Sequence, residues 1–215
     1  LGPNTGWLGG TGEAWERGPY YLDGLVPLAY QLEDEKLIAK TKKWIDWTVE
    51  HQQPDGRIGA VLGRGKYRTV HQESDTWWPN MIMLKVLAQY QEATGDPRVV
   101  PVMERYLEHH LRRTSAAPLR EWAEHRWADE VLTIVWLYNR TGNPKLLELA
   151  RKLHAQAFDW KAHFADFKYK GKISKNQANL HTHVVNNAMA MKTSAVWWQL
   201  SGDESDRKAI RQLLE

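Results

Sequence analysis

Four short clusters of carboxylate, histidine and tryptophan residues stand ahead of apolar helical stretches in this 215-residue chain. Carboxylates and imidazoles move protons between reacting groups, and an indole offers a flat apolar face with a donor at its edge. If the helices that follow pack parallel to one another, all four clusters meet at one end of the bundle, as the walls of a pocket do. The clusters are GEAWERGPYY (12–21), HQESDTWWPN (71–80), REWAEHRWADE (120–130) and NLHTHVVNN (179–187).

The first cluster sets Glu16 beside Arg17. Two interpretations stay open. The residues form an ion pair that fixes the loop, or they line a sugar subsite in which Trp15 or Tyr20 stacks on the ring. Asp23 follows one turn into an apolar helix, where an unpaired charge is costly. We therefore expect Asp23 to have a partner or to face the pocket.

The second cluster contains an adjacent pair of tryptophans, Trp77 and Trp78. Both cannot face the core on one helix, so we expect one of them to line the rim of the pocket. Asp75 is placed to cap the helix that Pro79 begins. Both tryptophans are retained as candidates for stacking on a sugar.

The third cluster is rich in charge. A spacing of four residues sets Glu121, His125 and Asp129 on one helical face, and Glu124 lies next to the imidazole in the sequence. A carboxylate–imidazole–carboxylate face suits proton transfer. A solvated face of salt bridges would show the same spacing, so both interpretations stay open.

The fourth cluster has His181 and His183 on either side of Thr182. Two histidines in an extended segment can bind a metal, but no third ligand stands nearby, so we predict no metal here. Hydrogen bonding to a sugar hydroxyl and plain packing are the remaining interpretations. Asn186, one turn later, would reach the same rim.

The stretches between the clusters read as helical hairpins. Apolar residues at helical spacing over 22–32, 79–91 and 131–138, and in a fourth stretch after Asn187, are each followed by a turn and a second helix. The turns ATGDP (93–97), RTGNP (140–144) and LSGDE (200–204) amount to an internal repeat. We predict one all-α domain over residues 1–215 with an ordered loop at 159–180.

Composition excludes several classes of function. The net charge is +3 and the basic residues are scattered, which argues against a nucleic-acid interface. The chain has no cysteine, so disulfides and thiolate metal ligands are absent from this sequence. No apolar run approaches the roughly 20 residues that span a bilayer. Twelve tryptophans are compatible with sugar binding as well as with a large helical core.

The clusters and the helices after them resemble the β-L-arabinofuranosidase family, glycoside hydrolase family 127. The resembling stretches are WERGPYYLDGLVPLAY (15–30), WWPNMIMLKVLAQYQEATGD (77–96), ADEVLTIVWLYNRTGNPKLLELA (128–150) and HVVNNAMAMK (183–192). The resemblance implies an (α/α)6 barrel that acts on glycans, outside the cytoplasm in a secreted or periplasmic setting.

The resemblance also implies what these residues lack. His183, with Asn186 beside it, matches the family's histidine before an inner helix. Arg17, Tyr20 or Tyr21, and Asn80 or Met81, stand where characterised members have histidines. The family's zinc-bound cysteine nucleophile and its glutamate belong to the second half of the barrel. We therefore expect this chain to be the first half, completed by further chain or by a second copy, with no cofactor of its own.

These observations together predict a glycoside hydrolase. Two alternatives remain: another (α/α)-barrel carbohydrate enzyme, such as an unsaturated-uronyl hydrolase, a lyase or an epimerase, and a non-catalytic helical repeat that binds glycan or protein. The candidate catalytic residues are Glu16, Asp23, Glu124 and His125. The candidate substrate-binding residues are Trp15, Arg17, Tyr20, Trp77, Trp78, Glu121, His181, His183 and Asn186.

Overall fold

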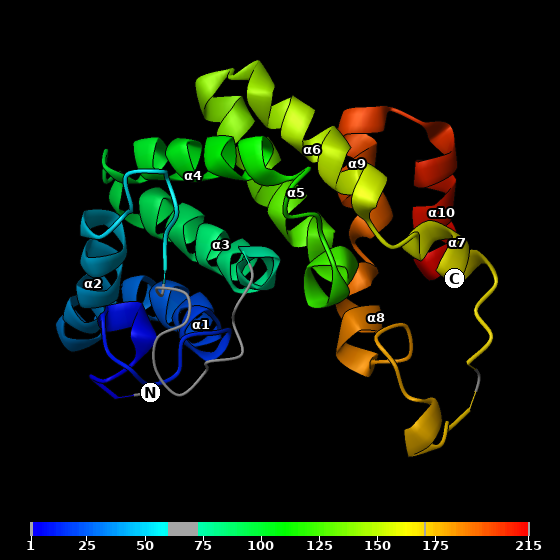
Figure 1. Cartoon of the computed structure of the whole chain (residues 1–215), viewed down its shortest axis with the longest axis horizontal. Helices are drawn as coiled ribbons and strands as arrows, with labels where there is room; N and C mark the ends of the chain where they lie inside the picture. Colours follow the sequence, from blue (N-terminus) through cyan, green and yellow to red (C-terminus); the bar gives the residue numbers. More distant parts are fainter. Residues whose placement is uncertain (1, 60–72, 170, 215) are drawn as a thin grey trace.

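The computed structural model describes residues 2–59, 73–169 and 171–214, and these contain helices but no strand. Successive hairpins follow one another from the blue end of the chain to the red end, and the two termini lie on opposite sides of Figure 1. The helices are α1 (Arg17–Gln31), α2 (Glu35–Glu50), α3 (Trp77–Thr94), α4 (Val99–Arg113), α5 (Glu121–Thr141), α6 (Pro144–Gln156), α7 (Trp160–Ala165), α8 (Val184–Ala190), α9 (Thr193–Ser201) and α10 (Glu204–Leu214), with short 3-10 turns at Gly6–Leu8, Glu73–Thr76 and Lys175–Gln177.

The predicted turns between paired helices are present. Gly95 and Gly142 end α3 and α5 at φ of +68° and +67°, a region that glycine enters without a steric penalty. After the second turn, the side chain of Asn143 accepts a hydrogen bond from the backbone of Lys145 and caps α6. Local sequence chemistry therefore fixes where each hairpin folds back.

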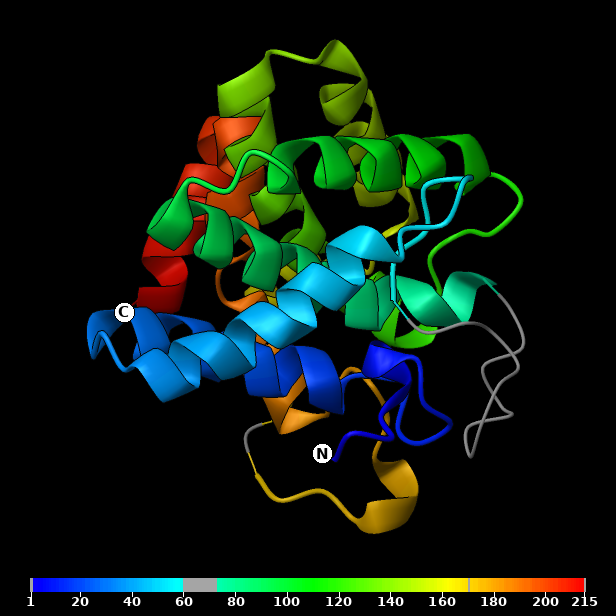
Figure 2. The ribbon, with the colours of Figure 1, turned by 90° about the vertical axis from the view of Figure 1, so that its left-hand side faces the viewer.

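The helices form an inner and an outer layer. The inner helices pack in succession, α1 on α3 and α3 on α5, and the outer helices α2, α4 and α6 each pack on an inner partner. Figure 2 shows the same succession from the side of the α1–α2 hairpin. Nearly every residue of α3 from Trp77 to Tyr90 is buried, which fits a helix enclosed on several sides. The fold is all-α, with helical hairpins that form part of an (α/α)6 barrel.

Two expectations about the last third of the chain were wrong in detail. The fourth inner helix is not continuous, because a turn at Met191 and Lys192 divides it into α8 and α9. Lys192 bonds to the buried Asp129 of α5 at this break, so a tertiary contact accompanies the interruption. The 159–180 segment contains α7, which Asp159 caps by accepting a hydrogen bond from Ala162.

Candidate functional site

The buried guanidinium of Arg126, near the start of α5, joins three inner elements. Its side chain is 3% exposed and lies over the ring of Trp78 on α3 at 4.6 Å and that of Trp122 at 6.0 Å. Its Nε donates to Oδ1 of Asn186 on α8 at 2.7 Å, and Nη1 contacts the sulfur of Met189. Residues from the second, third and fourth clusters therefore meet around one cation.

The first cluster closes this arrangement from α1. Trp78 donates its indole hydrogen to Oε2 of Glu16 at 2.7 Å, and the ring of Tyr20 meets the ring of Trp78 edge-on at 6.0 Å. Tyr20 is 37% exposed, and its hydroxyl lies 3.7 Å from the sulfur of Met189. The predicted convergence of the four clusters is thus confirmed by contacts. We call Glu16, Tyr20, Trp78, Trp122, Arg126, His183 and Asn186 the rim cluster.

Burial controls the ionisation of Tyr20. Desolvation raises the pKa of Tyr20 above its ordinary value, and the charge of Glu16 adds to this, while Arg126 opposes it. The phenol therefore keeps its proton at neutral pH. It can donate a hydrogen bond to a ligand oxygen, and it is a poor base.

Aromatic rings form the other side of the rim cluster. His183 caps α8, because its Nδ1 accepts a hydrogen bond from the backbone of Asn186 at 3.3 Å. The ring of Trp122 meets that of His183 edge-on at 5.2 Å and that of Trp15 at 6.2 Å. These contacts give the rim a continuous aromatic wall from the first cluster to the fourth.

Paired charges continue from the rim cluster along the inner helices. Asp129, 4% exposed, bonds to Nζ of Lys192, and Asp23 bonds to Lys85 at 2.9 Å and to Gln89 at 3.1 Å. The partner expected for Asp23 is therefore confirmed. Burial raises the pKa of Asp129 above its ordinary value, although the charges of Lys192 and Arg126 oppose the shift.

Two histidines meet beside the rim cluster. Nε2 of His125 lies 3.5 Å from Nδ1 of His181, and Nδ1 of His125 is 2.6 Å from the backbone oxygen of Glu121. The ring of His125 also stacks on Phe158. Burial lowers the pKa of His125, so this imidazole is neutral at pH 7. No group of three or more His, Asp or Glu side chains is arranged to hold a metal ion in the part of the chain that the structure describes.

The remaining predicted residues lie at the margin or away from the rim. Arg17 is exposed, and so is Glu121, the first residue of α5, with a left-handed φ of +50°. Glu124 is half-buried, and its backbone oxygen accepts a hydrogen bond from Phe158. His71, in the second cluster, falls outside the described residues, and the side chain of Asp75 does so too.

Trp77 departs from the predicted role in sugar stacking. It is fully buried, stacks on His110 at 3.8 Å and donates to the backbone oxygen of Ala117 at 2.8 Å. Both its ring and its donor are therefore occupied by protein. Trp78 is 1% exposed, so the expectation that only one of the two adjacent tryptophans would be buried was wrong, and Trp78 differs from Trp77 in its contacts with Glu16 and Arg126.

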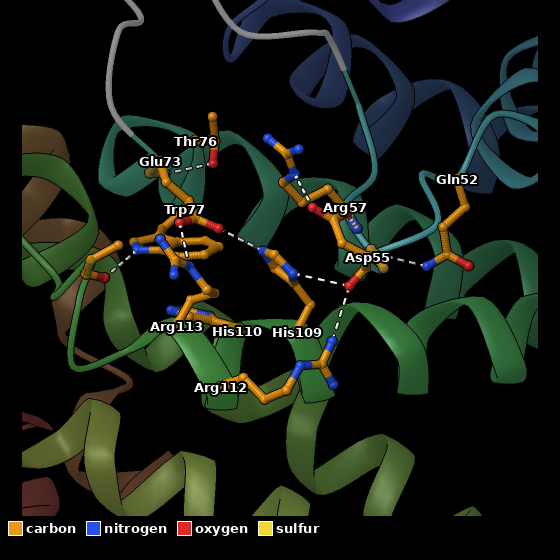
Figure 3. Close-up of polar contacts among 12 residues, drawn as sticks. Gln52, Asp55, Arg57, Glu73, Thr76, Trp77, His109, His110, Arg112 and Arg113 are labelled. Carbon is orange, nitrogen blue, oxygen red and sulfur yellow. Dashed lines mark hydrogen bonds and ion pairs between the residues drawn. The ribbon is translucent and has the colours of Figure 1, made fainter.

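Behind Trp77, a second polar group holds two loops on the outer helix α4 (Figure 3). Glu73 receives hydrogen bonds from both His109, at 2.6 Å, and Arg113, at 2.8 Å. The other ring nitrogen of His109 is 3.0 Å from the backbone oxygen of Asp55. One helical position further, His110 pairs with Glu130 of α5 at 2.7 Å, and neither side chain is exposed. We call Glu73, Trp77, His109, His110, Arg113 and Glu130 the α4 network.

Sequence reasoning had grouped Arg126 and Asp129 with other residues of the third cluster but had not chosen them. The usable signal was their spacing of three, which places both on one side of α5 with Trp127 turned elsewhere. Without the neighbouring helices, that side could not be recognised as the inner one.

The layered helical hairpins define an all-α fold that forms part of an (α/α)6 barrel. Comparison with protein families places the chain more narrowly. Residues 6–215 match the family described as β-L-arabinofuranosidase, GH127 catalytic domain. The chain belongs to this family.

Two solved structures are similar in fold. Ara127N-Se, a GH127 β-L-arabinofuranosidase from Geobacillus stearothermophilus T6, is 21% identical with a TM-score of 0.61 over 96% of this chain. The GH127 β-arabinofuranosidase BT3674 is 19% identical with a TM-score of 0.59 over 93% of this chain. The chain spans only 36% and 34% of these two proteins. A search of curated proteins gave no match.

Proposed function

We propose that the protein acts on glycans as a glycoside hydrolase, with β-L-arabinofuranosides as the substrate class, and that the rim cluster forms one wall of its sugar pocket. The observation that carries the proposal is the buried Arg126, held between Trp78 and Trp122 with Glu16 and Tyr20 beside them. Sugar sites combine aromatic faces with a few fixed donors and acceptors, and this wall offers both.

Hydrolysis of a glycosidic bond needs one group that protonates the leaving oxygen and a second that attacks the anomeric carbon or activates water. Asp129 is our candidate for the first task, because burial raises its pKa toward the protonated form, although the bond to Lys192 opposes this shift. Glu16 is the predicted catalytic residue with a bond inside the rim cluster. Asp23 is held by Lys85 and Gln89 and serves better to position α1 against α3.

The zinc and cysteine implied by the resemblance do not fit these residues. The sequence has no cysteine, and the described side chains include no cluster suited to a metal ion. We therefore assign no step to a metal and propose that the attacking group comes from outside these 215 residues, from further chain or from a second copy. A secreted or periplasmic location likewise stays a prediction from the resemblance.

The lyase alternative is weakened by one observation. A lyase of this kind would use Tyr20 as a proton acceptor, and the raised pKa of Tyr20 opposes that role. A sugar-binding repeat without turnover has the same rim cluster, so only an activity measurement separates it from a hydrolase.

The test is hydrolysis and binding of an aryl β-L-arabinofuranoside, compared with an unsaturated uronide. We expect the arabinofuranoside to be cleaved, and Arg126→Lys to lower kcat/KM about tenfold or more, since an ammonium cannot replace a stacked, forked guanidinium. The matched control is Arg140→Lys on the same helix, where the guanidinium stacks on the half-buried Trp136 at 3.8 Å. Cleavage of the uronide instead, or binding without turnover, would contradict the proposal.

A further inference from the structure

A partly open cavity of about 400 Å³ lies apart from the rim cluster and is lined by parts of α5, α6, α7, α9 and α10. Its walls include the aromatic rings of Trp127, Trp160 and Trp197. Cavities that hold small molecules start at about this volume and have the same mixture of aromatic walls and a few polar groups. We call this cavity the α9 pocket.

Two residues of its lining each carry a buried polar atom that has no hydrogen-bond partner among the described residues. These atoms are Nε1 of Trp127, in a residue 2% exposed, and Oγ1 of Thr193, in a residue 5% exposed. A buried donor or hydroxyl without a partner is costly, so such groups normally bond to protein, water or ligand. The neighbouring indole of Trp160, in contrast, donates to the backbone oxygen of His125, as a buried indole N–H ordinarily does.

The α9 pocket is a site separate from the rim cluster. Trp127 directly follows Arg126, and Thr193 directly follows Lys192, so each turns about 100° away from a residue that faces the rim side. Phe158 and Trp160 line the pocket and also contact the ring of His125. The rings of Phe158 and Trp160 therefore lie between the α9 pocket and His125, which stands beside the rim cluster.

The charge of the lining selects the kind of ligand. The lining contains the carboxylates of Asp159, Asp203 and Asp206 and one ammonium, that of Lys161, which pairs with Asp206 at 2.7 Å. Burial lowers the pKa of His154, so this imidazole adds no positive charge at pH 7. The excess of negative charge disfavours an anion. The described carboxylates form no metal-binding group, which leaves neutral or cationic organic ligands.

The donor and acceptor groups of the lining decide between a neutral and a cationic ligand. An indole N–H can only donate, so the ligand must offer an acceptor to Trp127, and ionised carboxylates can only accept, so the ligand must also offer donors. An ammonium compound has no acceptor. A hydroxyl group both donates and accepts, and several of them on one small ring would serve the indole, the Thr193 hydroxyl and the carboxylates together.

We propose that the α9 pocket binds a neutral polyhydroxylated ligand of the size of one or two sugar rings, at a site distinct from the rim cluster. The buried indole of Trp127 and the hydroxyl of Thr193 hydrogen-bond to its hydroxyl groups, and the acidic lining excludes anions. The proposal does not depend on which glycosidic bond, if any, the protein cleaves.

The test follows the indole N–H resonances of ¹⁵N-labelled protein during titration with L-arabinose. Trp127→Phe identifies the Trp127 signal by its disappearance, and Trp78 reports on the rim cluster in the same spectrum. We expect the Trp127 signal to shift and saturate. Methylammonium chloride and sodium sulfate serve as cationic and anionic probes and should leave it in place.

Thr193→Val removes the hydroxyl with little change of shape. This variant should bind L-arabinose about fivefold more weakly, as followed by the Trp127 signal. Its matched control is Thr41→Val in α2, another buried hydroxyl without a partner in the described chain but outside the pocket. A Trp127 signal that never moves, one that answers to methylammonium alone, or equal affinities in the two valine variants would overturn the proposal. A shift at Trp78 without one at Trp127 would leave the proposed hydrolase standing and remove the second site.

Discussion

The rim cluster and the α4 network contain the same kinds of residue, but the His110–Glu130 pair of the α4 network is closed to solvent, whereas the rim cluster includes the exposed side chain of Tyr20. In the α4 network, both carboxylate oxygens of Glu73 and both ring nitrogens of His109 bond to protein groups. In the rim cluster, Tyr20 is 37% exposed, and its hydroxyl lies 3.7 Å from the sulfur of Met189 and interacts with Arg126. Enclosed groups stabilise a fold, whereas a partly exposed group can also contact a ligand.

The largest expected effect lies in the α4 network. Glu130→Ala leaves His110 buried without its partner, and breaking one side of a fully buried pair costs about 3–5 kcal/mol. Urea unfolding should show this loss. Glu148→Ala removes half of an exposed pair with Lys152 and should cost under about 1 kcal/mol. Equal losses in the two variants would mean that the buried pair has no special weight.

The rim cluster should show the opposite pattern. Glu16→Gln keeps an oxygen for the indole of Trp78 but removes the charge, so we expect kcat/KM on an aryl β-L-arabinofuranoside to fall about a hundredfold. The free energy of unfolding should change by less than about 1 kcal/mol. Steady-state kinetics and urea unfolding of the same preparation test both parts. A large loss of stability with kinetics unchanged would assign Glu16 to the fold.

Ionisation sharpens the comparison, because the pKa of Glu73 in the α4 network and the pKa of Asp129, next to the rim cluster, are shifted in opposite directions. Burial raises the pKa of Glu73, but hydrogen bonds from Arg113 and His109 outweigh it and leave the pKa below the ordinary 4.5. Its contribution to stability is therefore present above about pH 4.5 and lost as the pH falls through the folded pKa. Asp129, with a raised pKa, contributes most below its ordinary 3.8 and loses that contribution as the pH rises through its folded pKa.

Unfolding free energy measured against pH should separate the two. Compared with Glu73→Gln, the wild type should lose stability as the pH falls below 4.5. Compared with Asp129→Asn, the wild type should lose stability as the pH rises above 3.8. Curves that run parallel to the wild type would contradict the assigned shifts.

The smallest effect is expected from Tyr20→Phe. The variant removes a single half-exposed donor, so arabinofuranoside binding should weaken about two- to tenfold while the pH profile of activity stays the same. Calorimetric titration and a pH–rate profile check this. A lost basic limb in the profile would make Tyr20 a proton-transfer group and revive the lyase alternative.

Much of the fold could be predicted because its signals are local. The TG turns and the apolar spacing of α1 to α6 lie within a few residues of the features they determine. The break at Lys192 carries no glycine or proline and coincides with a bond to Asp129, sixty-three residues away. The six residues of α7 are too few to show a helical period, although Asp159 was a readable cap.

The site was predictable in position but not in detail. The four clusters indicated the correct end of the inner helices, because each cluster precedes or begins one of these helices. Adjacent residues were harder to predict: both Trp77 and Trp78 are buried, but only Trp78 lies against Arg126, and the rotation of α3 decides this. Arg126 looked like one more surface charge, because nothing in the sequence marks which side of α5 meets α3 and α8.

The central claim is that the rim cluster binds a furanoside, and the indole N–H resonance of Trp78 tests it most directly. Titration with methyl β-L-arabinofuranoside should shift this resonance in the wild type. In Arg126→Lys we expect the furanoside to bind about tenfold less tightly, so the same shift needs a higher concentration. A Trp78 signal that stays in place in saturating furanoside, while the protein remains folded, would contradict the account.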